Sequence, residues 1–265
     1  MGRYKLFDDK TYQEWTRTWA QPVVDAIYAN DPQAGLSRIA DARAALVSSE
    51  LTPAQQECMQ LSLDWYEFNL KQIGEHLQRQ RLNFERMVEH LNNPGQTPQG
   101  ICQRQRLMLA LRCEGDANGF RTFTRKEVDE QLAAIPDSDK DNMVWQSLGL
   151  WAFRHRDKEL LANAYELMLT QPSITLGQAK WQRVHLMHGL VLGTATRQDV
   201  LETVKSLAVL PQLDEFENLV WPRCIEAGLV DEELEQLLKE KSAAIKAQGP
   251  LPPPERRTKG IRSEL

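Results

Sequence analysis

The chain is punctuated by helix-start signals that recur at regular distances. The segment TPAQ at 52–55 combines a capping hydroxyl, a proline at the first helical position and a glutamine that can complete a capping box. Further caps of this type are Asp31, Thr97, Thr196 and Asp231. Between these points apolar residues recur three and four positions apart, as on one face of an α-helix. No stretch shows the sustained alternation of a β-strand, so the sequence predicts an all-α protein.

The predicted helices pair into hairpins. We expect hairpins at 11–47, 53–91, 98–135, 140–170, 176–209 and 214–247. Successive hairpins begin about 36 to 45 residues apart, within the period that is typical of repeat proteins. A single hairpin cannot bury its apolar face, so stacking on its neighbours supplies the core. We therefore predict that residues 1–248 form one helical-repeat domain, a right-handed α-α superhelix. The uneven unit lengths leave an irregular helical bundle as the alternative.

Residues 249–265 differ in composition from the rest of the chain. A proline cluster at 252–254 cannot continue a helix, and the basic segment RRTKGIR follows it at 256–262. We predict that this region is a flexible, proline-rich basic tail.

Composition and charge narrow the possible functions. Leucine outnumbers valine and isoleucine together, which favours helix because straight-chain residues lose little rotamer freedom there. The net charge of −5 argues against a protein that coats nucleic acid. The segment MGRYKLFDDK at 1–10 lacks the apolar region of a secretory signal, and no apolar run is long enough to span a membrane. Four widely spaced cysteines without a C-x-x-C pair indicate reduced, buried thiols. We expect a cytoplasmic protein that does not bind membranes.

One window shows a recognisable repeat spacing. It is WQSLGLWAFRHRDKELLANAYELMLTQP, residues 145–172. Its Trp145, Leu148, Gly149, Ala152, Tyr165 and Pro172 fall on or near signature positions and resemble a tetratricopeptide repeat. Small residues let two helices approach closely, and the large ones fill the space between them. The window departs from the family pattern at Leu161 and Met168, where small alanines are usual. It departs again at Arg156, where glycine is usual, and Pro172 arrives one residue early.

The resemblance implies a binding function. Tetratricopeptide families mostly bind peptides or partner proteins along a concave surface built by the first helices of the hairpins. On that pattern Gln146, Leu150, Phe153 and Arg154 would project toward the partner. We therefore expect a non-catalytic scaffold, adaptor or assembly chaperone with another protein or peptide as partner, and no cofactor. The alternative is that Leu150 and Phe153 belong to the core and Arg154 is a solvated charge.

A second resemblance suggests an enzyme. Arg183-Val184 followed by His188 resembles the R-φ-x-x-x-H signature of HEPN ribonucleases, in which Arg binds the scissile phosphate and His moves a proton. A ribonuclease that uses Arg183 and His188 is the alternative function, although such spacings also arise by chance. His185 and His188 lie one helical turn apart, but no third ligand is apparent, so we predict no metal site.

A nucleic-acid-binding regulator is the third hypothesis. It would use the basic turn at 154–156, with Trp151 and Phe153 nearby for base stacking, together with the basic tail. The acidic run at 137–142 lacks the glycine and the carboxylate that a calcium loop needs at its sixth and twelfth positions. We interpret it as a helix start, where acidic groups favour the positive end of the helix dipole.

Overall fold

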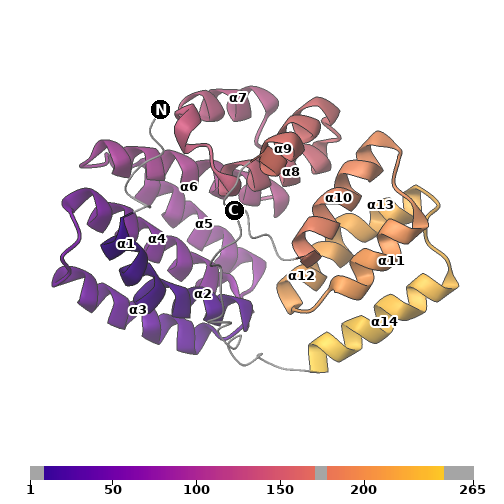
Figure 1. The fold of residues 1–265 in the computed structure, drawn as a ribbon, viewed down its shortest axis with the longest axis horizontal. Coiled ribbons are helices and arrows are strands. Elements are labelled where there is room, and N and C mark those ends of the chain that lie inside the picture. Colours follow the sequence, from indigo (N-terminus) through magenta and orange to yellow (C-terminus); the bar gives the residue numbers. More distant parts are fainter. Residues whose placement is uncertain (1–8, 171–177, 248–265) are drawn as a thin grey trace, which may run out of the picture.

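The protein is built from α-helices. The computed structural model describes residues 9–170 and 178–247, and within these ranges no strand occurs (Figure 1). The predicted tail at 249–265 and the repeat-signature residue Pro172 lie outside the described residues. None of the described helices is long and apolar enough to span a membrane.

The described helices form six consecutive hairpins, and their bounds lie close to the predicted ranges except at the start of the sixth. Their bounds are α1–η1–α2 (Lys10–Trp15, Thr16–Ala20, Gln21–Tyr28) with α3 (Pro32–Val47), α4 (Pro53–Gln72) with α5 (Leu77–Asn92), α6 (Pro98–Ala117) with α7 (Arg125–Ala133), α8 (Asn142–His155) with α9 (Lys158–Thr170), α10 (Gln178–Leu192) with α11 (Arg197–Ser206), and α12–η3–α13 (Leu210–Glu215, Phe216–Val220, Trp221–Glu226) with α14 (Glu232–Ala247). A single 3₁₀ turn, η2 (Asp137–Asp139), precedes α8.

The predicted caps set the helix starts. The side chains of Asp31, Thr52, Thr97 and Thr196 each accept a backbone N–H of the first turn, and Thr52 and Thr196 complete capping boxes. The acidic run ends as predicted, with the Asp141 carboxylate accepting from the first turn of α8. A start predicted at residue 214 is wrong, because α12 already begins at Leu210.

The first five hairpins pack on one another through their first helices, and the last packs on the fifth through α14 against α11. Helix α2 contacts α4, α4 contacts α6, α6 contacts α8, and α8 contacts α10. Within hairpins, α8 packs along α9 and α10 along α11. Figure 1 shows the chain progressing from the hairpins of α2–α5 through α8 and α9 to the hairpins of α10–α14. Each hairpin thus buries its apolar face against its neighbours, as stacking requires.

Each hairpin turn contains one residue in the left-handed backbone region. These residues are Asn30, Gly74, Gly119, Arg156, Gly193 and Gly228. In five of the turns the next residue donates its N–H to the carbonyl five positions earlier, which is the Schellman closure of a helix end. Glycine adopts this conformation without steric cost and asparagine tolerates it, whereas other residues lose about 1–2 kcal/mol. Arg156 is therefore the exception among the six.

The first and last hairpins share a second device. The N–H of Gln21 bonds to the carbonyl of Thr16, and the N–H of Trp221 bonds to that of Phe216, each five residues back. Both π-type segments end two positions before a proline, Pro22 or Pro222. Proline has no N–H and its ring clashes with the preceding turn. A wider turn at that point relieves this clash. Both first helices are therefore irregular at their middles.

The largest hydrophobic cluster runs through the last four hairpins and contains the repeat-like window. Trp151 donates its indole N–H to the carbonyl of Phe123 at 3.0 Å. A Cβ placed on Gly149 would lie 3.9 Å from Met168 Cε, an ordinary contact. Met168 therefore lies beside Gly149, at a position where the tetratricopeptide pattern has alanine. An alanine there would let the two helices pack more closely. All four cysteines are free and buried, as predicted, and burial raises the pKa of the Cys58 thiol to about 11.

Candidate binding pocket

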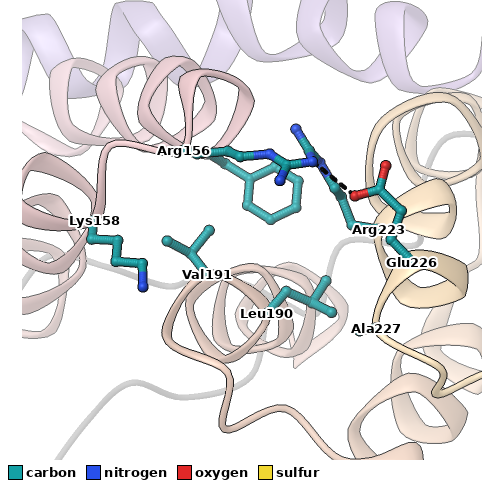
Figure 2. A pocket seen from close by; sticks show the side chains of 8 residues that line it. Arg156, Lys158, Leu190, Val191, Arg223, Glu226 and Ala227 are labelled. Carbon is teal, nitrogen blue, oxygen red and sulfur yellow. Dashed lines mark hydrogen bonds and ion pairs between the residues drawn. The ribbon is translucent and has the colours of Figure 1, made fainter.

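A pocket of about 320 Å³ lies where the last three hairpins meet (Figure 2). It is lined by Phe153 and Arg156 at the end of α8, Lys158 at the start of α9, Leu190 and Val191 on α10, and Arg223, Glu226 and Ala227 at the end of α13. This volume falls at the lower end of the range for small-ligand sites, so it suits one large side chain or a short segment.

The pocket has an apolar floor and a charged rim. Phe153, Leu190, Val191 and Ala227 supply the apolar surface. The rim carries three cations, Arg156, Lys158 and Arg223, against the single carboxylate of Glu226, so the lining is net +2. The chain as a whole is net −5. A positive site in an acidic protein attracts anions locally, since the field of nearby charges dominates at short range.

Glu226 holds the two arginines in place. Its Oε2 accepts from Arg156 Nη2 at 2.9 Å and from Arg223 Nη1 at 3.0 Å. Arg223 Nη2 also donates to the carbonyl of Arg154 at 3.4 Å. The Arg156 and Glu226 side chains are 67% and 57% exposed, so their pair adds little to stability. Its effect is to position two guanidinium groups at the rim.

Lys158 stands apart from this arrangement. Its side chain is exposed and lies across the hollow from Glu226 (Figure 2). Its ammonium makes no ion pair with any described residue. The pocket therefore has an arginine pair on one side and, on the other, Lys158 without an ion-pair partner among the described residues.

The predicted partner residues on α8 divide into two groups. Gln146, Leu150 and Arg154 are half-buried and follow one another at intervals of four, so they share one face of the helix. Phe153 is only 1% exposed and belongs to the hydrophobic core, as the alternative interpretation expected. A partner can reach its ring only through the pocket floor.

Arg154 lies among acidic groups without an ion pair to any described residue. Burial lowers the pKa of its guanidinium, while Asp116, Glu215 and Glu114 raise it. Its buried Nε has no hydrogen-bond partner. Burial also raises the pKa of Glu114 to about 7, although Arg154 acts in the opposite direction. Helices α6 and α12 thus place negative charge around Arg154 of α8.

The ribonuclease pair is not brought together. Residues five apart on an α-helix point about 140° from each other. Arg183 is 5% exposed and its Nε donates to Glu215 on α12 at 3.1 Å. His188 instead stacks on Tyr165 of α9, with the ring centroids 4.3 Å apart. Burial, followed by the charge of His185, lowers the pKa of His188. Within the chain, Arg183 is thus buried and paired with a carboxylate, and His188 lies against an aromatic ring.

No metal-binding cluster is found in the described part of the chain. The Tyr165 hydroxyl lies 3.1 Å from His185 Nδ1, so both histidines of α10 meet this tyrosine rather than each other. No group of three or more His, Cys, Asp or Glu side chains among the described residues could hold an ion.

Most of the pocket was missed by the reading of the sequence. Arg156 and Glu226 are 70 positions apart, and nothing in their local sequences links them. The one available signal was Arg156 itself, at a turn position where the resembled family prefers glycine.

Comparison of the chain with protein-family models, with curated proteins and with solved structures finds no match.

Proposed function

We propose that this protein is a non-catalytic scaffold or adaptor that binds a segment of a partner protein on a tetratricopeptide-like right-handed superhelix. The packing of first helix on first helix through α2, α4, α6, α8 and α10 supports this arrangement. The observation that carries the proposal is the pocket at the meeting of three hairpins, with a fixed arginine pair over an apolar floor. Interfaces are anchored by such pockets when a few side chains insert into them.

A protein partner fits the pocket better than a nucleic acid does. Single-stranded nucleic acid is held by exposed aromatic faces on which bases stack. The only aromatic ring in the lining is Phe153, which is 1% exposed, and the rest of the floor is aliphatic. Four free, buried thiols are consistent with the reducing cytoplasm as the site of action.

The test is capture of a partner from a cell lysate with the tagged protein, followed by mass spectrometry. We expect a stoichiometric partner that is lost on Lys158→Glu, a change at an exposed residue of the pocket lining, after circular dichroism has shown that the variant folds. Lys239→Glu is the matched control, because Lys239 is exposed on α14 and does not line the pocket. Capture that is equal for both variants, or no partner at all, would remove the proposal.

A further inference from the structure

We propose that the pocket recognises an acidic peptide segment in which an aliphatic side chain is flanked by carboxylates. The inference rests on the proposed function and specifies the chemistry of its partner. The aliphatic side chain would enter the floor formed by Leu190, Val191 and Ala227, and the carboxylates would pair with the cations of the rim.

The rim has donors to spare for such a ligand. A guanidinium carries five N–H donors, and among described partners Arg156 uses one of them, on Glu226. Lys158 adds an ammonium without an ion partner in the described chain. Because Glu226 already orients the two arginines, a carboxylate that binds them pays less ordering entropy than it would at free side chains.

The backbone conformation of Arg156 also supports a binding role for its side chain. Its φ of 56° places an arginine in a conformation that the other five turns give to glycine or asparagine. A residue held in such a region costs stability and persists where something else requires it. At this turn the additional feature is the side chain, which reaches the pocket rim and pairs with Glu226. The strain is therefore explained if the guanidinium serves binding.

The floor and its surroundings favour an amphipathic ligand over a bare anion. Leu190, Val191 and Ala227 line the pocket with aliphatic surface beside its cations. Inorganic phosphate or RNA would use the cations but would leave this apolar surface in water.

The experiment measures fluorescence polarisation of a fluorescein-labelled peptide, Ser-Glu-Glu-Leu-Glu-Glu-Ser, with the full chain. Matched peptides carry alanine in place of leucine, or lysine in place of every glutamate. We expect binding of the first peptide only, weakened about tenfold or more by Lys158→Glu and by Val191→Trp, which fills the floor. Lys239→Glu should leave the affinity unchanged.

Arg156→Gly separates a binding role from a structural one. We expect this variant to lose peptide affinity while its melting temperature stays the same or rises, because glycine adopts the turn conformation freely. A variant that binds normally would overturn the proposal.

Three further outcomes would also overturn the proposal. They are no binding of the acidic leucine peptide, equal binding of the alanine peptide, and displacement by inorganic phosphate or oligouridine at lower concentration than by unlabelled peptide. The scaffold proposal is judged separately. If the partner captured from lysate is lost by Lys158→Glu while the acidic leucine peptide does not bind, the scaffold stands and the inference about the chemistry of its ligand fails.

Discussion

The turn between α2 and α3 and the turn between α8 and α9 share one backbone and differ in one side chain. Asn30 and Arg156 have φ values of 55° and 56°. The aspartate that follows each donates its N–H five residues back, to Ala26 or Ala152, at 3.0 and 2.9 Å. Asparagine is a usual occupant of this conformation and arginine is not. The two turns thus have the same backbone conformation, and only the side chain at 156 lines the pocket and pairs with Glu226.

The largest difference between the two turns should lie in their caps. Asp31 Oδ1 accepts from Ala34 N–H and Asp157 Oδ1 accepts from Leu160 N–H, both at 3.0 Å. Asp157 also pairs with Arg125 across to α7. We expect Asp157→Ala to lower the free energy of unfolding by about 1–2 kcal/mol and Asp31→Ala by about 1 kcal/mol, measured by urea denaturation. Asp157→Asn keeps a capping oxygen and should recover most of the loss. Equal losses for the two alanine variants would contradict the role of the Arg125 pair.

Transplanting the arginine tests whether Arg156 is strained. Gly193 occupies the corresponding position after α10 with φ of 76°, and a Cβ built on it meets no atom within 4 Å. We expect Gly193→Arg to lower the free energy of unfolding by about 1 kcal/mol through backbone strain alone. Gly193→Asn is the control and should lose less. A neutral Gly193→Arg variant would mean that arginine is not costly at these turns.

The end of α6, next to Arg154, also carries charge that responds to pH. The pKa of Glu114 is raised from 4.5 to about 7, so the folded protein holds this proton more tightly than the unfolded chain does. Stability should therefore fall as pH rises from about 4.5 through 7, where the unfolded chain has released the proton first. We expect Glu114→Gln to raise the free energy of unfolding by on the order of 1 kcal/mol at pH 8 and to match the wild type below pH of about 5. A gap between the two proteins that does not change with pH would contradict the assignment.

The smallest expected effect is that of Arg156→Gly, which should raise the free energy of unfolding, whereas most substitutions lower it. Arg156→Gly removes the strained side chain and an exposed ion pair of little energetic value. We expect a gain of about 0.5 kcal/mol in the free energy of unfolding, measured by denaturation in urea. Asn30→Gly should change it by only a few tenths, because asparagine already tolerates the conformation. A loss of stability in Arg156→Gly would show that the Glu226 pair outweighs the backbone strain.

The sequence predicted what local rules control. The Thr52 and Thr196 capping boxes place helix starts. In each box the threonine hydroxyl accepts the backbone N–H three residues later, and the side chain of that later residue accepts the backbone N–H of the threonine. It did not predict the wider helical turns before Pro22 and Pro222, because a proline in mid-helix can be met by a kink, a break or a π-type turn.

The candidate site could not be predicted, because contact there is decided by packing between hairpins. The spacing of Arg183 and His188 matches a catalytic signature, yet packing directs one toward Glu215 and the other toward Tyr165. Arg223 and Glu226 gave no signal in the sequence and acquire their place only when α13 reaches the end of α8.

The distribution of the hydrophobic clusters has a consequence for folding. One continuous cluster joins α6 to α14, whereas the apolar residues of α1 to α5 are divided among three smaller clusters, one of which bridges to α6. In stacked-hairpin proteins neighbouring units unfold together when they share a core and separately when they do not. The first two hairpins should therefore open at lower free energy, seen as faster amide hydrogen exchange. A chain that frays in this way at its amino-terminal end keeps its binding pocket, because every residue of the lining belongs to the part that unfolds last.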